Sequence, residues 1–510
     1  MAEKILALNV PPGIRRDGAY IEGDLTCVDG QWVRFDRNRP RKIGGYFRIT
    51  NELPNKIYGI YIDDFDDLSN IYTGHQDGIG EVIIYSDGSP GRFYDRTPGG
   101  FATNADYLWQ IDQMFDSDSG QSLIIAHPGL NLTNIGNTTA TAVLSGIEED
   151  TSDFITLTGA TPPPDVSGGV LITHPYAWFY GSDGFVTWSV PNTPGDVTIA
   201  SGGGGLAGAR IAESKIVKGL SYRSGGGASP SALFWSLNSL IRATFIGGAA
   251  VFRFDTISNQ TTILSSRTPI EYDGVFYWWA VDRYMRFVGF PQEVPNDKNL
   301  DWFFANLNQN CRQKVFSFKV PRRGEIWTCF PYGDATECTH AVIYNVRNNA
   351  WYDTELPNNG RTDGTAAQTY GYPFLTGAQA EAGEYKLWQH ETGWDEVDGG
   401  LVNAVNSYFQ TGNLAAPTAT GHDKELQSIM LEPDFVQTGN MSVRIVGKNN
   451  ARGPSVLSTQ HAFSDQTEVI YLKDSRRFFQ MLFSSNVVGG YYLMGTPCLH
   501  IRETGGRDTA

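Results

Sequence analysis

The chain has 510 residues, of which 57 are glycine and 13% are aromatic, and its formal net charge is -16. Abundant glycine for turns and abundant aromatic residues for half-buried, pleated surfaces are typical of a turn-rich β protein. Charged residues make up only 18% of the chain, which excludes a disordered or coiled-coil protein. The acidity argues against high-affinity binding of nucleic acid, because such binding needs lysine and arginine to neutralise phosphates.

Five cysteines lie along the chain without a CxxC pair or a spacing that suits zinc. Cys329 and Cys338 could face each other across a hairpin, but we expect free buried thiols. No apolar run approaches the length of a membrane span, and the first residues lack the apolar core of a signal peptide. We therefore expect a protein without a membrane span that is made and kept in a reducing compartment.

Residues 1–55 predict an extended arm and a basic hairpin. Two short strands, 32–35 and 42–49, are joined by a polar turn with the sequence Asp-Arg-Asn-Arg-Pro. The following residues, 51–120, hold thirteen acids and three bases. Because Arg34, Arg41 and Lys42 sit beside residues that pack, we expect these three side chains to contact protein partners rather than to read DNA bases.

From residue 56 the chain consists of short apolar and aromatic runs that are broken by Gly, Asp, Asn and Pro. The runs have the length of strands, and the long ones indicate burial on both faces. Hairpins with aromatic residues after the turn recur at 83–95, 342–353 and 385–395, and the second resembles a kelch-type outer hairpin. This repetition predicts a β-propeller over residues 56–396. A large β-sandwich with accidental similarity between its hairpins is the alternative.

Four other segments depart from the blade pattern. Residues 131–170 are rich in Thr, Ala and Gly, which predicts an inserted β segment rather than a blade core. Residues 207–220 and 296–306 are the two candidate helices. Residues 397–510 show strands with turn signals roughly every ten residues, which predicts a separate C-terminal β-sandwich. The predicted fold is therefore all-β, a propeller with an N-terminal arm and hairpin, an inserted β segment and a C-terminal sandwich.

Motifs that would indicate catalysis or a cofactor are incomplete. Gly203, Gly205 and Gly208 match the spacing GxGxxG, but no acidic residue lies between 214 and 254 to hold a ribose. Residues 182–188 carry the letters of a sialidase Asp-box in a compressed spacing. The acidic run 63–67 lacks the glycine and glutamate of an EF-hand. The sequence therefore predicts no cofactor, no metal site and no enzymatic activity.

The order of residues in 31–49 resembles the opening of the tail nozzle proteins of short-tailed bacteriophages (podoviruses), also called packaged-DNA stabilisation or tail hub proteins. The likeness lies in Val-Arg-Phe, a polar turn with proline, a basic pair, Ile-Gly-Gly and an aromatic residue. The run RRFFQMLFSSNVVGGYYLMG, followed by a terminal Gly-Gly-Arg, resembles the end of the same proteins. No single motif is diagnostic, and the likeness depends on the order of features at both ends.

This resemblance implies a structural virion protein that is assembled in the host cytoplasm and becomes part of the phage tail. It implies a homo-oligomeric ring, a hexamer, below the head-to-tail adaptor, which extends the DNA channel and retains packaged DNA until ejection. The implied partners are other copies of the chain, the tail adaptor protein, tail fibre, spike or needle proteins, and double-stranded DNA that passes without specific binding. The alternative is a carbohydrate-binding or glycan-hydrolysing propeller that recognises the host surface.

The charge pattern leads to an expectation about the channel. If the acidic segments face inward, the wall is acidic or neutral, and retention of DNA is mechanical rather than adhesive. Retention then needs a constriction built from loops, for which the sequence offers a glycine loop and an acidic loop. The candidate residues are Gly202, Gly203, Gly204, Gly205, Asp63, Asp64, Asp66 and Asp67.

Overall fold

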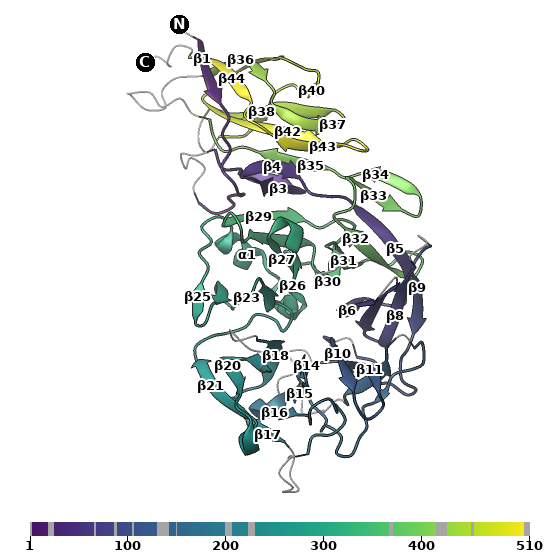
Figure 1. The fold of residues 1–510 in the computed structure, drawn as a ribbon. Coiled ribbons are helices and arrows are strands. Elements are labelled where there is room, and N and C mark those ends of the chain that lie inside the picture. The colour runs from purple at the N-terminus through teal and green to yellow at the C-terminus, as the bar shows by residue number, and fades with distance from the viewer. Residues whose placement is uncertain are drawn as a thin grey trace.

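The computed structural model in Figure 1 describes residues 3–18, 25–65, 68–85, 89–104, 107–129, 142–148, 150–198, 207–222, 230–366, 371–414, 426–449 and 453–503. Within these residues the protein is almost entirely β-structure, with one short α-helix. The helical elements are α1 (Leu300–Asn306) and the 3-10 turns η2 (Ser182–Gly184), η3 (Gly248–Ala250), η4 (Gln309–Lys314) and η5 (Pro321–Arg323).

Six successive sheets in the described part of the chain are four-stranded antiparallel meanders, which we number as blades 1 to 6 in chain order. Blade 1 contains β6 (Ile57–Phe65), β7 (Leu68–His75), β8 (Gly78–Ile84) and β9 (Arg92–Asp95); blade 2 contains β10 (Gln110–Asp116), β11 (Gln121–His127), β12 (Leu144–Ile147) and β13 (Ile155–Thr156); blade 3 contains β14 (Gly169–Thr173), β15 (Tyr176–Tyr180), β16 (Phe185–Trp188) and β17 (Gly208–Arg210). Blade 4 contains β18 (Ile216–Ser221), β19 (Ser231–Ser236), β20 (Leu240–Phe245) and β21 (Phe252–Ser258); blade 5 contains β22 (Ile270–Tyr272), β23 (Val275–Trp279), β24 (Tyr284–Phe287) and β25 (Pro291–Glu293); blade 6 contains β26 (Phe316–Val320), β27 (Glu325–Phe330), β28 (His340–Asn345) and β29 (Ala350–Glu355).

Blade 7 is completed by a strand from the N-terminal part of the chain. Its order is β30-β31-β32-β5-β33-β34, in which β5 lies antiparallel to β32 and parallel to β33. Because β5 directly precedes blade 1 in the chain, this pairing ties the first blade to the last. The strands are β30 (Arg361–Ala366), β31 (Pro373–Gly377), β32 (Tyr385–His390), β5 (Tyr46–Leu53), β33 (Asp395–Asp398) and β34 (Leu401–Ala404).

The first strands of neighbouring blades contact one another around a common axis. The contacts run from β6 to β10, β14 and β18, and from β22 to β26, β30 and back to β6. Blades 4 and 5 pack through the rings of Trp235 and Trp278, whose centroids are 5.7 Å apart. The seven sheets therefore close into a propeller (Figure 1).

Some blade strands, such as β15 and β23, are apolar or aromatic along their whole length because both faces of their blades pack against neighbours. All five residues of β15, Tyr-Ala-Trp-Phe-Tyr, are buried. In β23, Trp278 and Trp279 are fully buried, which confirms that this aromatic run belongs to the core.

Three further sheets form the sandwich, and each combines one or two strands of the N-terminal arm with strands from the C-terminal part. The predicted arm, residues 1–55, thus contributes to the sandwich through β1 to β4 and to the propeller through β5. The first sheet contains β1 (Glu3–Ala7), β44 (Cys498–Glu503), β36 (Leu426–Glu432) and β41 (Ile470–Arg476); the second contains β2 (Asp29–Gln31), β35 (Ser407–Gln410), β42 (Phe478–Ser485), β38 (Met441–Lys448), β39 (Val456–Leu457) and β40 (His461–Phe463); the third contains β3 (Val33–Asp36), β4 (Arg39–Lys42), β43 (Tyr491–Met494) and β37 (Phe435–Thr438).

Several sequence expectations need correction. Residues 144–147 and 155–156 of the expected insertion 131–170 form the third and fourth strands of blade 2, and residues 130–141 lie outside the described residues. The expected helix 207–220 is instead β17 and β18, because its apolar residues fill the core between blades 3 and 4. The hairpin expected at 385–395 does not form, because β5 lies between β32 and β33.

The helix expected at 296–306 exists in shortened form as α1. Its first amides are capped by a residue of the N-terminal arm, since Asp17 accepts hydrogen bonds from the amides of Asp301 and Trp302 at 2.9 and 2.8 Å. All five cysteines are free, and Cys329 and Cys338 are both buried.

Candidate functional site: the basic hairpin and the propeller axis

The basic hairpin belongs to the third sheet of the sandwich and lies on the side that contacts blade 6 (Figure 1). Val33 pairs with Lys42, and Asp36 pairs with Arg39. The two turn residues, Arg37 and Asn38, have φ angles of 51° and 61°. Two successive residues with positive φ are the mark of a type I′ turn, whose twist matches that of the flanking strands.

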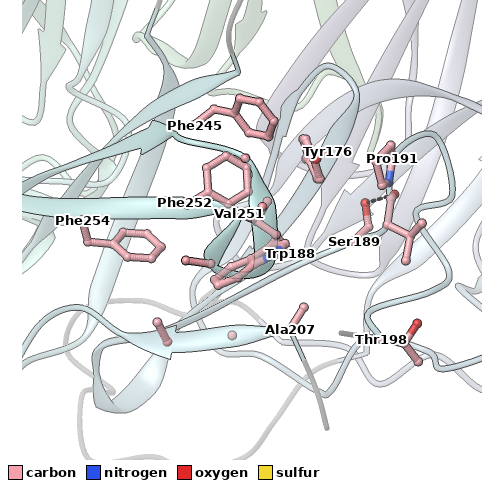
Figure 2. A pocket seen from close by; sticks show the side chains of 16 residues that line it. Tyr176, Trp188, Ser189, Pro191, Thr198, Ala207, Phe245, Val251, Phe252 and Phe254 are labelled. Carbon is pink, nitrogen blue, oxygen red and sulfur yellow. Dashed lines mark hydrogen bonds between the residues drawn. The ribbon is translucent and has the colours of Figure 1, made fainter. Parts of the chain in front are cut away.

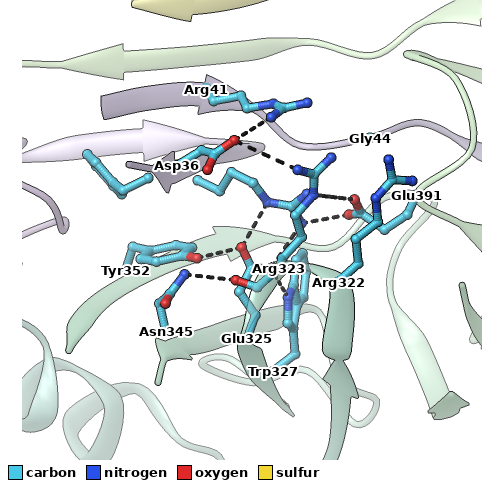
Figure 3. Close-up of polar contacts among 12 residues, drawn as sticks. Asp36, Arg41, Gly44, Arg322, Arg323, Glu325, Trp327, Asn345, Tyr352 and Glu391 are labelled. Carbon is cyan, nitrogen blue, oxygen red and sulfur yellow. Dashed lines mark hydrogen bonds and ion pairs between the residues drawn. The ribbon is translucent and has the colours of Figure 1, made fainter. Parts of the chain in front are cut away.

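Arg34 of β3 is buried between the carboxylates of Glu325 and Glu391. Figure 3 shows these two glutamates. The Nη1 and Nη2 atoms of Arg34 both lie 2.6 Å from the Glu391 carboxylate oxygens, and its Nε and Nη2 lie 2.8 and 2.9 Å from those of Glu325. The two partners follow Arg34 by 357 and 291 residues. This separation is the reason that no local sequence signal points to the network.

Both carboxylates have donors or an opposite charge within the chain. Glu325 accepts the hydroxyl of Tyr352 at 2.7 Å and the indole N–H of Trp327 at 2.8 Å. Burial alone raises the pKa of Glu391, but Arg34 beside it outweighs burial and holds the pKa below its usual value. The network therefore joins β3 of the sandwich to β27 of blade 6 and to the turn after β32 in blade 7.

The expectation that Arg34, Arg41 and Lys42 contact another protein is wrong for Arg34 and Lys42, because both are buried within the chain. Lys42 donates to the Gly490 carbonyl at 2.8 Å, and burial lowers its pKa to about 8. Arg41 is 16% exposed and forms an ion pair with Asp36. Packing against the chain's own partners thus occupies all three side chains.

The expected constriction residues lie mostly outside the described part of the chain. Gly202 to Gly205, Asp66 and Asp67 are not among the described residues. Asp63 is buried in β6 and pairs in register with Asn70, and Asp64 pairs through its backbone with Ser69. The glycine loop and the acidic loop as channel constrictions stay predictions.

The propeller axis is lined by charges of both signs. Lys218 of blade 4 interacts electrostatically with Asp112 of blade 2, Asp363 of blade 7 and Arg267. Arg267 also forms an ion pair with Asp363 at 2.6 Å. Burial raises the pKa of Asp112 to about 6, although its carboxylate accepts the amide hydrogen of Ile172 at 2.8 Å.

A cavity of about 660 Å³ lies at the outer strands of blades 3 and 4 (Figure 2). No charged side chain lines it among the described residues. A sugar site needs a few well-placed polar groups beside its aromatic walls, so this cavity suits an apolar group better. The aromatic side chains that line it are Tyr176, Trp188, Phe245, Phe252 and Phe254.

The described residues contain no group of three or more His, Cys, Asp or Glu side chains that could hold a metal ion. No helix in the same part of the chain is long and apolar enough to cross a membrane.

The arrangement at the hairpin is that of a structural joint, because each buried charge faces an opposite charge or a hydrogen-bonding partner.

No protein-family model matches the chain, and no curated protein matches it. Among solved structures it is similar to YCF48 bound to D1 peptide (11% identity, 67% of this chain, 94% of that chain, TM-score 0.38). It is also similar to an exo-β-1,3-galactanase from Phanerochaete chrysosporium (8% identity, 90% and 100% coverage, TM-score 0.33). A third similar structure is the WD40 β-propeller domain of Doa1 (12% identity, 68% and 97% coverage, TM-score 0.38). At these scores the likenesses carry no inference about function.

Proposed function

We propose that this protein is a nozzle subunit of a short bacteriophage tail, a structural virion protein that extends the DNA channel and retains packaged DNA until ejection. The observation that carries the proposal is that the two segments resembling nozzle proteins meet in one sheet. Arg41 of β4 pairs with Leu493 of β43. Arg39 and Lys42 also donate to the carbonyls of Gly495 and Gly490 at 2.9 and 2.8 Å. The resemblance at the two ends thus belongs to one structural feature.

The tight connection between propeller and sandwich supports the same proposal. Trp32 of the arm packs edge-on against Tyr46 of blade 7 and Trp327 of blade 6, with ring centroids 6.1 and 6.0 Å apart. One hydrophobic cluster runs from these blades into the sandwich. A channel subunit has to keep its shape while DNA passes, and a shared core together with the Arg34 network suits that task.

The partners proposed with this function are five further copies of the chain in a hexameric ring, the tail adaptor protein, and tail fibre, spike or needle proteins. Double-stranded DNA passes through the ring without specific binding. The site of action is the virion, after assembly in the host cytoplasm.

The proposal is tested by locating the protein in purified phage particles. Mass spectrometry of the particles should detect the chain in several copies, and gold-labelled antibodies should bind at the short tail. Absence of the chain from particles would contradict the proposal. Release of oligosaccharides from capsular glycan by the purified monomer would instead support the carbohydrate-directed alternative.

A further inference from the structure

A cavity of about 390 Å³ lies between the turn of the basic hairpin and the edge of blade 6. Five arginines and two carboxylates line it, which leaves an excess of positive charge in a chain whose net charge is -16. The charged lining residues are Arg34, Arg37, Arg322, Arg323, Arg347, Asp36 and Glu325.

The two carboxylates are already engaged by other groups. Glu325 is paired with Arg34 and accepts hydrogen bonds from Tyr352 and Trp327. Asp36 is paired with Arg41 (Figure 3). Asp36 also lies 3.8 Å from Arg323, but among the described residues neither carboxylate pairs with Arg37, Arg322 or Arg347 at the mouth of the cavity.

The arginines at the mouth are left with donor capacity. Within the described part of the chain, the guanidinium groups of Arg37 and Arg322 have no acceptor, and both residues are exposed. Arg347 uses its Nη atoms on the backbone carbonyls of Pro321 and Arg322 at 2.8 and 3.0 Å. Those carbonyl contacts hold the Arg347 side chain over η5 without cancelling its charge.

Arg323 lies deeper in the cavity than Arg37 and Arg322, and its surroundings also carry an excess of positive charge. Its nearest carboxylate oxygens, on Asp36 and Glu391, are 3.8 Å away, and its Nε atom has no hydrogen-bond partner. Burial first, and then the charges of Arg34 and Arg41, lower the pKa of Arg323 below its ordinary value.

We propose that Arg37, Arg322, Arg323 and Arg347 form a binding site for a phosphate-type oxyanion that carries two or more negative charges. Planar guanidinium groups bind phosphate oxygens through paired, charge-assisted hydrogen bonds. Four such groups around one cavity match a ligand with several anionic oxygens, such as pyrophosphate or the phosphates of a nucleotide. This site lies outside the proposed nozzle function and does not depend on it.

Titration calorimetry of the full-length chain with pyrophosphate tests the site, with ionic strength held constant by sodium chloride and no divalent cation present. The test variant is Arg37→Ala/Arg322→Ala. The matched control is Arg253→Ala/Arg283→Ala, which also removes two exposed positive charges, from blades 4 and 5, where Asp255 and Asp282 pair with them. Because all four side chains are exposed, the thermal midpoints of both variants should match that of the unmodified chain.

The expected result is saturable binding by the unmodified chain and the control, and binding weaker by at least about tenfold in the test variant, since two charge-assisted contacts are lost. Inorganic phosphate should bind more weakly than pyrophosphate. Equal affinity in the test variant, or no saturable binding by the unmodified chain, would overturn the proposal. A short DNA duplex should fail to displace pyrophosphate, and displacement would overturn the assignment to a free oxyanion.

Discussion

At the scale of single residues, Arg34 is the side chain on which the joint between propeller and sandwich depends most. Its removal leaves Glu325 and Glu391 buried with an uncompensated negative charge. Breaking a buried ion pair by deleting one partner costs about 3–5 kcal/mol. Arg34→Met should therefore lower the free energy of unfolding by roughly this amount, as measured by urea denaturation.

The matched control for this variant is Arg253→Met. Arg253 is 60% exposed and pairs with Asp255 on the surface, and exposed pairs contribute about 0–1 kcal/mol. Equal and small effects of both substitutions would show that the Arg34 network does not stabilise the fold.

Asp112 provides a pH-dependent test of the propeller axis. Burial raises the pKa of its carboxyl to about 6, so the folded state penalises the carboxylate. The penalty is absent below the ordinary pKa of 3.8, grows as the pH rises from 3.8 to about 6 and is complete above 6. Asp112→Asn should therefore become more stable relative to the unmodified chain as the pH increases, by about 2–3 kcal/mol in total.

Thermal or urea unfolding of both proteins between about pH 4 and pH 8 measures this difference. The exposed Asp118→Asn serves as the control for the removal of one negative charge. A stability difference for Asp112→Asn that is constant or falls with rising pH would contradict the assigned burial of the carboxylate.

At the scale of structural elements, the pairing of β5 within blade 7 closes the propeller. Gly45 precedes β5, and a Cβ atom there would lie 2.1 Å from the Asp395 carbonyl oxygen and 2.5 Å from its amide nitrogen. Since backbone atoms cannot move aside as a flexible side chain can, Gly45→Ala should separate β33 from β5. We expect a loss of about 2 kcal/mol or more in the free energy of unfolding.

Gly377→Ala in β31 of the same sheet is the control. Its added Cβ would meet its nearest atom, the Lys386 carbonyl oxygen, at 3.5 Å, an ordinary contact distance. Unfolding of both variants at the same urea concentration would contradict the prediction. It would show that the close approach of Gly45 to the Asp395 backbone is not needed for the stability of blade 7.

Elements with local signals could be predicted from the sequence. The hairpin 342–353 forms as β28 and β29, with the rings of Tyr344 and Trp351 4.6 Å apart. Apolar runs such as β15 and β23 were recognisable because burial on both faces requires continuous apolar residues.

Elements that depend on distant partners could not be predicted in this way. The composition of the Thr-, Ala- and Gly-rich segment around β12 and β13 predicts an insertion rather than a blade. The segment nevertheless joins blade 2, because β11 pairs with β12 and Arg96 donates a hydrogen bond to the Ile147 carbonyl. The same reason explains the candidate site. The sequence predicts an interface role for Arg34. This prediction is wrong because Arg34 is buried against Glu325 and Glu391, and nothing near Arg34 in the sequence reveals these two partners.

At the scale of the whole molecule, the net charge of -16 predicts weak interaction with DNA. Each phosphate contact adds about one unit to the slope of log affinity against log salt. We expect purified protein to show little retention of a DNA duplex at low salt and almost no salt dependence. Tight binding that weakens steeply with added salt would contradict a channel that releases DNA without adhesion.

Cryo-electron microscopy of the intact virion tests the central claim most directly, because it gives the position, copy number and channel lining of the chain together. We predict a closed ring of six copies below the head-to-tail adaptor, with side chains facing the channel that are mainly acidic or neutral. A single copy in the tail, a position away from the DNA path, or a channel lined mainly by lysine and arginine would contradict it.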